Sequence, residues 1–306
     1  MNPFGYVDRP IHIAAFGKTD VGRRRSENQD NFLIADLSVP VAKGGFFQDT
    51  DDLGPGVGRF VLGPHGALAL VADGMGGAAA GAVASKLAVG WIYRTLSTRW
   101  PEDRNHSPQQ FATWLRSAVI EANGRIFGEA AETPAYAGMG TTATVAGIYE
   151  DFLYVAQVGD SRAYLVRRGT IEQMTRDQSV VQELIDAGTL TEAEAELNDH
   201  GNVILQALGT APSVRVEFTY HELRRGDTIL LCSDGLFRMV RKHEIADAAV
   251  RLADPAALCD HLVALANERG GPDNVTVVVL RVDGYGLHES SDGEVVSRRV
   301  YALPDL

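Results

Sequence analysis

Short apolar runs rich in β-prone residues alternate along the chain with longer amphipathic runs. We expect strands over 12–16, 31–35, 67–72, 214–220, 227–233 and 274–282. The region 141–174 holds three more apolar runs, with turns at Glu150-Asp151, Gly159-Asp160 and Arg168-Gly169. Short turns between successive strands predict an antiparallel meander in this region.

Helical patterns fall between the strand runs, over 81–96, 107–130 and 255–271. Ser107 is expected to cap the second helix, with Pro108 at its first position. The capping boxes Thr175-x-x-Gln178 and Thr191-x-x-Glu194 predict two further short helices. Because strand runs and helix runs are mostly segregated, the predicted fold class is α+β, with antiparallel sheets and helices packed outside them.

A single large domain is expected over residues 11–285, preceded by an N-terminal extension over 1–10. The polar segment 286–306 is predicted to extend beyond that domain. The stretch 38–66 is rich in Gly and Pro and predicts a long hairpin or a surface insertion. The beginning of the chain has no basic segment followed by an apolar run, so no secretory signal is predicted.

The composition is ordinary for a folded protein, with 45% hydrophobic and 22% charged residues. A net charge of −12 disfavours a nucleic-acid partner or an anionic membrane surface. The most apolar region, 66–93, contains Asp73, Lys86 and several glycines, so no membrane insertion is expected. The two cysteines, Cys232 and Cys259, exclude a disulfide framework and favour a reducing compartment such as the cytoplasm.

Five aspartates stand at turns beside the ends of apolar runs: Asp30, Asp73, Asp160, Asp234 and Asp273. An Asp-Gly turn is common without any function, so each alone is more often structural. Together they are expected to converge at one end of a sheet, where carboxylates repel one another unless cations lie between them. Oxygen ligands without Cys/His clusters select Mg²⁺ or Mn²⁺, and Gly74 lets a backbone carbonyl approach such an ion.

A site with two metal ions suits phosphate-ester hydrolysis, because the ions activate a bridging water and hold the phosphate. Uncatalysed hydrolysis of phosphate monoesters needs up to ~10²¹-fold acceleration, whereas a lone general base supplies only ~10²–10⁴-fold. Arg23, Arg24 and Arg25 precede Asp30 and offer a guanidinium for the phosphate dianion. A solvated basic patch is an equally good interpretation of these three arginines alone.

The stretch from Cys232 to Arg238 permits a second interpretation, since C-x-x-G-x-x-R is the phosphate-binding loop of cysteine-dependent phosphatases. In such a loop the amides and the arginine bind the dianion, and a helix N-terminus lowers the pKa of the thiol. Asp234 lies inside the loop, where its carboxylate would repel both thiolate and phosphate. Cys232 also ends an apolar run, as buried unreactive cysteines do, so we favour the metal chemistry.

Several motifs resemble those of the metal-dependent serine/threonine protein phosphatases of the 2C type, in a bacterial style and in the family's order over roughly 11–283. They are GRRRSENQD, VADGMGGAAAGAVAS, GMGTTATVA, VGDSRAYLVRRG, LTEAEAE, ILQALGT, GDTILLCSDGLF and GGPDNVTVVVLRV. The resemblance implies an α-β-β-α sandwich, two packed antiparallel sheets flanked by helices, with metal ions at one end. It also implies hydrolysis of phosphoserine and phosphothreonine in proteins, opposing a serine/threonine kinase in a bacterial cytoplasm.

Carried over by position, the resemblance implies that Asp73 bridges two Mn²⁺ or Mg²⁺ ions and that Gly74 supplies a carbonyl ligand beside it. Asp234 and Asp273 resemble ligands of the first ion. Asp160, together with Asp234, resembles the pair that holds a third, weaker ion.

The resemblance also implies a phosphate-binding role for Arg25. Asp30 resembles an acidic residue that holds metal-bound water at the second ion. The segment 178–208 resembles a mobile flap beside the site. Phosphorylated proteins, including a kinase, are the expected partners of a chain expected to be a monomer.

Three residues depart from the family pattern. Gln29 stands where many members have glutamate, and an uncharged amide is expected to weaken the second metal site. Met75 and Gln178 stand where histidines are common, and methionine cannot donate a proton to a leaving group. These departures leave open a catalytically weak member that binds phosphoproteins, and the motifs also permit a phosphatase of small phosphate esters.

Overall fold

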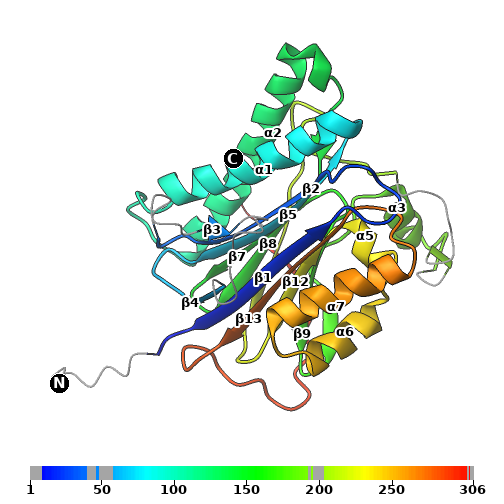
Figure 1. Cartoon of the computed structure of the whole chain (residues 1–306). Helices are drawn as coiled ribbons and strands as arrows, with labels where there is room; N and C mark the ends of the chain where they lie inside the picture. Colours follow the sequence, from blue (N-terminus) through cyan, green and yellow to red (C-terminus); the bar gives the residue numbers. More distant parts are fainter. Residues whose placement is uncertain are drawn as a thin grey trace.

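The computed structural model describes residues 9–39, 46–47, 58–191, 194–195, 203–301 and 303. Two antiparallel sheets pack face to face in this part of the chain, and helices cover the outer face of each sheet (Figure 1). The predicted α+β class and the α-β-β-α order of layers are therefore confirmed. Almost all of the expected extension at residues 1–10 lies outside the described residues.

One sheet has six strands within the described residues, in the order β10-β9-β12-β13-β1-β4. These strands are β1 (His12–Asp20), β4 (Arg59–Val61), β9 (Arg162–Arg167), β10 (Thr170–Gln173), β12 (Thr228–Cys232) and β13 (Val275–Asp283). The second sheet has eight, in the order β14-β11-β8-β7-β5-β2-β3, with β6 paired to β5. Its strands are β2 (Asp30–Asp36), β3 (Phe46–Phe47), β5 (Ala67–Met75), β6 (Gly140–Thr141), β7 (Ala143–Tyr149), β8 (Phe152–Val158), β11 (Glu217–Glu222) and β14 (Arg299–Val300).

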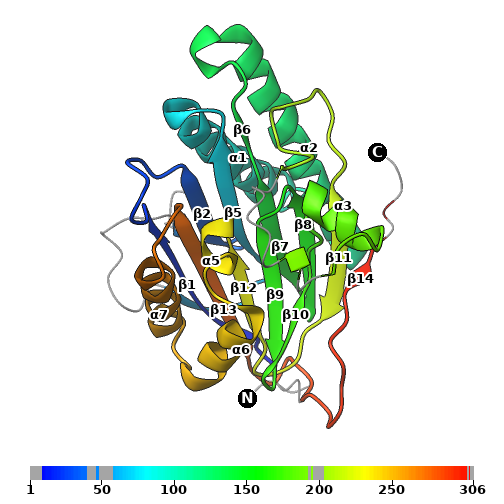
Figure 2. The same ribbon diagram turned by 90° about the vertical axis from the view of Figure 1, so that its right-hand side faces the viewer.

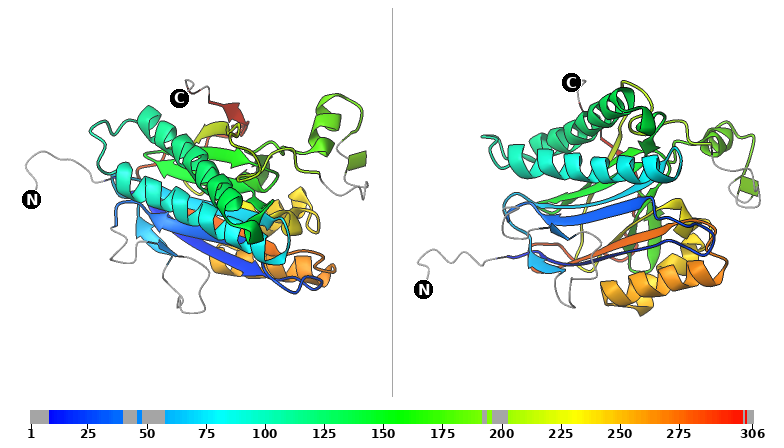
Figure 3. Two further views of the ribbon diagram at one scale, coloured as in Figure 1. Left: turned by 90° about the horizontal axis from the view of Figure 1, so that it is seen from above. Right: turned by 45° about the horizontal axis from the view of Figure 1, so that its top comes forward.

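Each sheet carries its own helical layer (Figure 3). Helices α1 (Ala78–Arg99) and α2 (Pro108–Glu132) cover the eight-stranded sheet, and the short 3₁₀ helix η2 (Pro134–Tyr136) follows α2. Helices α5 (Asp234–Phe237), α6 (Lys242–Arg251) and α7 (Pro255–Glu268) cover the six-stranded sheet. Helix α3 (Val180–Asp186) projects from one end of the sandwich.

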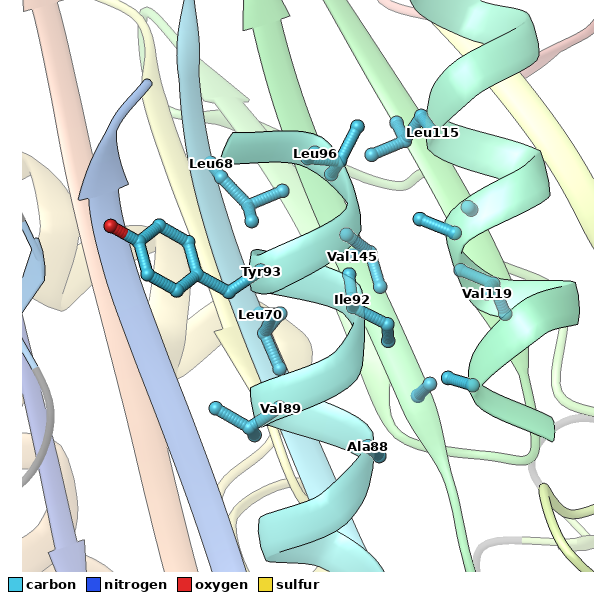
Figure 4. Packing of buried hydrophobic residues seen from close by; sticks show 14 of the residues in the cluster. Leu68, Leu70, Ala88, Val89, Ile92, Tyr93, Leu96, Leu115, Val119 and Val145 are labelled. Atoms are coloured by element: carbon cyan, nitrogen blue, oxygen red, sulfur yellow. The ribbon is translucent and has the colours of Figure 1, made fainter. Parts of the chain in front are cut away.

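The sequences of the central strands are continuously apolar because these strands are buried on both faces. In β5, Leu68 and Leu70 pack toward Ile92 and Leu96 of α1, as Figure 4 shows. The alternate positions of the same strand, such as Val71, belong to the core between the two sheets. Alternation along the strand therefore divides one apolar run between two cores.

The predicted meander over 141–174 is wrong at one turn. Strands β7 and β8 pair with each other in the eight-stranded sheet, whereas β9 and β10 pair in the six-stranded sheet. The turn at Gly159-Asp160 therefore crosses from one sheet to the other. Gly159 has φ +97°, and a Cβ there would lie 2.6 Å from Thr142 Cγ2, so this crossing requires glycine.

The helix ends agree in part with the predicted caps. Ser107 accepts a hydrogen bond from Gln110 N, and the reciprocal bonds of the Thr191–Glu194 box are present. The box at Thr175 does not open a helix, because Ser179 caps α3 and accepts from Gln182 N.

The C-terminal segment folds back onto the domain, which differs from the expected extension after residue 285. Leu287 and Val296 are 3% and 4% exposed and belong to the core between the sheets. Glu294 pairs with Arg167 Nη1 at 2.7 Å, and β14 adds a strand to β11. The segment is polar in composition, so the sequence did not predict that Leu287 and Val296 are buried or that Glu294 pairs with the buried guanidinium of Arg167.

The stretch 38–66 joins the two sheets, since β3 pairs with β2 and β4 pairs with β1. Residues 40–45 and 48–57 of the predicted hairpin or insertion lie outside the described residues. Among the helices that the structure describes, none has the length and apolar character needed to cross a membrane.

Candidate metal centre

The expected aspartates gather at the end of the sandwich that carries α5 and α3, which Figure 2 faces. Asp30 begins β2 and lies directly opposite Asp73 of β5 in the antiparallel register. Asp234 begins α5 directly after β12, and Asp273 precedes β13. Asp160 occupies the crossing between β8 and β9. Both sheets therefore contribute carboxylates to one end, as the sequence predicted.

The backbone around Asp73 is held by the start of the β6–β7 segment. Asp73 N donates to Thr142 Oγ1 at 2.9 Å, and its carbonyl accepts from Thr141 Oγ1 and Thr142 N, both at 2.9 Å. Gly74 N donates to Gln29 O at 3.2 Å. A Cβ at Gly74 would lie 2.2 Å from Gly81 O, so no larger residue fits between β5 and α1.

Asp30 ties the two sheets together at this end. Its Oδ2 accepts hydrogen bonds from Ser233 Oγ, just after β12, at 2.7 Å and from Thr276 Oγ1 of β13 at 2.6 Å. Its Oδ1 is buried without a partner in the structure. One oxygen is thus anchored, and the other is available to a ligand.

The carboxylates of Asp234 and Asp273 each contact an arginine. Asp234 Oδ2 lies 2.9 Å from Arg238 Nη2, one helical turn further on, and Asp234 Oδ1 is buried without a partner. Asp273 Oδ1 accepts from Asn274 N at 2.9 Å, and its Oδ2 accepts from Arg25 Nη2 at 2.7 Å. Arg25 therefore reaches the carboxylate group from the rim, with 55% of its side chain exposed.

Asp160 is the least exposed of the five aspartates, at 1%, and neither of its carboxylate oxygens has a partner. Gln178 supports the loop beside it. Gln178 Oε1 accepts from Gly159 N at 2.8 Å, and the Gln178 amide donates to Arg215 O. Gln178, one of the three residues that depart from the family pattern, therefore holds the loop that positions Asp160.

Burial and mutual repulsion disfavour the charged forms of these groups. Burial raises the pKa of Asp73 well above its ordinary value, and the charges of Asp30 and Asp234 raise it further. Burial raises the pKa of Asp30 to about 7 against the opposing effect of its two hydroxyl donors. The pKa of Asp160 is likewise raised to about 7, first by burial and then by the charge of Asp234.

These residues fit divalent cations. Asp30, Asp160 and Asp234 bear buried carboxylate oxygens with no partner, and hard oxygen donors of this kind suit Mg²⁺ or Mn²⁺. No three His, Cys, Asp or Glu side chains of the described residues form a ready-made cage. Two of the expected ligand carboxylates instead contact Arg25 and Arg238. The unpartnered oxygens and the mutual repulsion of the carboxylates make this end of the sandwich the candidate metal centre.

The structure contradicts the cysteine interpretation of the stretch 232–238. Cys232 is fully buried at the end of β12, and burial raises the pKa of its thiol, whereas a nucleophilic cysteine needs a lowered pKa. The arginine of the motif, Arg238, pairs with Asp234. The motif is therefore a coincidence of spacing.

Sequence reasoning missed several residues that complete the site. Ser233 and Thr276 hold Asp30, and Thr142 holds the backbone of Asp73. Arg238 was noted only as part of the cysteine motif, although its i,i+4 spacing from Asp234 on a short helix could have indicated the ion pair. The two hydroxyl contacts with Asp30 join residues more than 200 positions apart, and no local signal predicts them.

Two departures from the family pattern have structural roles here. The Gln29 side chain donates to Gly77 O at 2.8 Å and so joins the loop before β2 to the beginning of α1. Gln178 holds the Gly159 loop, as described above. Met75 is 37% exposed beside the site and makes no polar contribution.

Substituting Arg25 tests its proposed contact with phosphate. We expect Arg25→Ala to raise KM for a phosphorylated substrate about tenfold or more, because a charge-assisted contact to phosphate contributes ~1.5–3 kcal/mol. Steady-state kinetics would measure the change, with Arg24→Ala as the matched control, since Arg24 is an exposed arginine next in the chain. Equal KM values for the two variants would remove Arg25 from the substrate site.

Comparison with known proteins agrees with this architecture. Residues 50–267 match the family model described as Protein phosphatase 2C. The serine/threonine phosphatase stp of Listeria welshimeri is 35% identical over 264 residues, which cover 86% of this chain and 93% of that protein. The crystal structure of the Mycobacterium tuberculosis serine/threonine phosphatase PstP superimposes with a TM-score of 0.71 at 32% identity, covering 89% of this chain and 99% of that chain.

A further solved structure bears on the metal ions. The catalytic domain of the serine/threonine protein phosphatase PstP, in complex with two manganese ions, matches with a TM-score of 0.69 at 32% identity, over 89% of this chain and 99% of that chain. The sandwich and its carboxylate end thus define a metal-dependent serine/threonine protein phosphatase. The chain belongs to the protein phosphatase 2C family.

Proposed function

We propose that this chain removes phosphate from phosphoserine and phosphothreonine in proteins by means of Asp73, Gly74, Asp234 and Asp273 as ligands of two Mn²⁺ or Mg²⁺ ions. Asp30 is proposed to act at the second ion through water. When bound, such ions lower the pKa of a water molecule and neutralise the charge of the phosphate. The observation that carries the proposal is the convergence of buried, partly unpartnered carboxylates from both sheets at one end.

The side chains of this site divide the work of binding and orientation. Arg25 lies on the rim, where its guanidinium can donate to the oxygens of a phosphate dianion while its contact with Asp273 holds it in place. Ser233 and Thr276 fix the orientation of Asp30, so that its free oxygen faces a defined position. Asp160, on the crossing between the sheets, is proposed to act with Asp234 on a further cation.

Phosphorylated proteins are the proposed substrates, and a serine/threonine kinase in a bacterial cytoplasm is the proposed opposing enzyme. The printed names of relatives such as the Listeria phosphatase support a protein substrate. The two buried free cysteines are compatible with a reducing compartment. A monomer remains our expectation.

The first test is hydrolysis of p-nitrophenyl phosphate by chelator-treated protein, for the wild type and Cys232→Ser. We expect no activity without metal, recovery with Mn²⁺, and the same recovery in both proteins, because Cys232 is buried away from the chemistry. Phosphopeptides containing phosphoserine or phosphothreonine would then be compared with small phosphate esters. Activity that ignores metal and is lost in Cys232→Ser would refute the proposal, and folded protein without any activity would favour a phosphoprotein-binding role.

A further inference from the structure

A cluster of uncharged polar side chains lies where the chain crosses from the eight-stranded sheet to the six-stranded sheet. Its members are almost fully buried, at 0–3% exposure, and are Thr142, Thr144, Gln157, Ser161 and Gln178. A buried polar group costs free energy unless it is hydrogen-bonded, so a cluster whose members bond to one another is held in one arrangement. The cluster therefore fixes the path of the crossing.

The backbone on both sides of Asp160 is bound by this cluster. Ser161 O accepts a hydrogen bond from Gln157 Nε2 and lies close to Thr144 Oγ1, both at 2.8 Å. Gly159 O accepts from the same Gln157 Nε2 at 2.9 Å. Neither carboxylate oxygen of Asp160 has a partner in the structure, so its two neighbours in the chain determine its position.

Regular strand pairing ends before the crossing. The pairing of β7 with β8 stops at Ala143 and Val158, two residues before Asp160, and β9 begins in the other sheet. Over this short stretch the buried side chains bind Gly159 and Ser161 in place of a strand neighbour. The position of the crossing therefore depends on side chains more than on the sheet.

Thr142 joins the crossing to the strand that carries Asp73. Strand β5 pairs with β6 and β7 in one continuous register, which places Thr142 directly opposite Asp73. Thr142 Oγ1 accepts a hydrogen bond from Asp73 N at 2.9 Å and lies 2.7 Å from Ser161 Oγ, where either hydroxyl can donate. Two hydrogen bonds thus connect the backbone of Asp73 with the residue that follows Asp160.

We propose that Ser161 is a positioning residue for the metal centre, and that the Thr142–Ser161 hydroxyl pair fixes the position of Asp160 relative to Asp73. The inference rests on the proposed function, in which both aspartates hold metal ions. Without the pair, Asp160 would have a wider range of positions, and a bound ion would have to order it. Residues that orient metal ligands typically change metal affinity or activity by ~10–100-fold.

Calorimetric titration of chelator-treated protein with Mn²⁺ tests the role of Ser161. We expect Ser161→Ala to weaken the binding of at least one Mn²⁺ ion by about tenfold, because it removes the hydroxyl and leaves every proposed ligand in place. Thr142→Ser keeps both hydroxyls and is expected to bind Mn²⁺ as the wild type does. Thr95→Val is the matched control, because it removes a buried hydroxyl that donates to Glu121 between α1 and α2.

A double variant tests whether the two hydroxyls act as a pair. Thr142→Val also leaves Asp73 N without its acceptor, so it is expected to weaken Mn²⁺ binding at least as much as Ser161→Ala. Thr142→Val/Ser161→Ala is expected to bind Mn²⁺ as Thr142→Val does, because the second substitution removes a partner that is already lost. Losses that multiply in the double variant would overturn the pair.

Thermal unfolding of the metal-free proteins separates positioning from stability. Ser161→Ala and Thr95→Val are both expected to melt below the wild type, since each loses a buried hydrogen bond, whereas only Ser161→Ala is expected to lose Mn²⁺ affinity. If Ser161→Ala does not stay folded without metal, Ser161→Cys takes its place. A thiol is similar in size and hydrogen-bonds more weakly, so a smaller loss of affinity in the same direction is expected.

The outcomes distinguish this inference from the proposed function. A Ser161→Ala protein that melts below the wild type but binds Mn²⁺ with the same affinity would overturn the positioning role and leave the two-metal phosphatase intact. A folded wild type that binds no Mn²⁺ would overturn the proposed function and this inference with it. Equal losses of Mn²⁺ affinity in Ser161→Ala and Thr95→Val would also overturn the inference, because they would show an effect of stability alone.

Discussion

Asp73→Asn is expected to reduce Mn²⁺-dependent hydrolysis by about 10³-fold or more. A metal ion contributes several kcal/mol to stabilising charge on a phosphate, and each ~1.4 kcal/mol corresponds to a tenfold change in rate. Asp73 is the proposed ligand of both ions, so its neutral amide would weaken both. Initial rates at saturating Mn²⁺ with p-nitrophenyl phosphate and with a phosphopeptide would measure the loss.

A measurement of stability distinguishes this loss from misfolding. The Asp73 carboxyl is repelled by Asp30 and Asp234, so the metal-free Asp73→Asn protein is expected to unfold at a temperature equal to or above that of the wild type. Asp36→Asn serves as the control, because Asp36 ends the same strand that Asp30 begins and is bound to Ser38 N. Full metal-dependent activity in Asp73→Asn would refute the assignment of the metal centre.

Deletion of residues 286–306 is expected to lower the free energy of unfolding by about 5 kcal/mol. Leu287 and Val296 are almost fully buried between the sheets, and each such side chain contributes ~1.5–3 kcal/mol. Glu294 also leaves Arg167, whose side chain is 3% exposed. Since whole domains are stable by only ~5–15 kcal/mol, the truncated protein is expected to be marginal. Urea unfolding of metal-free protein would measure the change.

A matched pair of neighbouring valines tests the same contact without a truncation. Val296→Ala is expected to cost about 2 kcal/mol, because it removes buried methyl groups, whereas Val295→Ala is expected to be nearly neutral at 76% exposure. Equal effects of the two substitutions would contradict the buried position of Val296. Unchanged stability after the deletion would restore the expectation of an independent tail.

Local patterns predicted the elements well because their causes are local. The cap at Ser107 depends on a residue three positions away, and the apolar runs around 67–72 record burial along a single strand. The meander failed at Gly159-Asp160 because a short turn within one sheet and a short crossing between sheets look alike in sequence. The segment after 285 failed because its polar residues outnumber the two that are buried.

The gathering of the aspartates at one end could be predicted from the sequence, but their contacts could not. All five aspartates were identified from their positions at turns, and the structure brings both sheets' contributions to one end. The partners of Asp30 could not be predicted, because Ser233 and Thr276, which donate to its Oδ2, lie 203 and 246 positions further along the chain. Arg238 was considered only as part of the cysteine motif, which we did not favour, and its ion pair with Asp234 was not predicted.

The sequence by itself determined which residues carry charge, which turns carry the aspartates and which runs become strands and helices. These properties follow from side-chain chemistry and from interactions over about four residues. Only the tertiary structure decided that Asp160 lies between the sheets, that Arg238 pairs with Asp234, and that Val296 fills the core. Such contacts depend on strand register and on the packing of one sheet against the other, which join residues that are far apart along the chain.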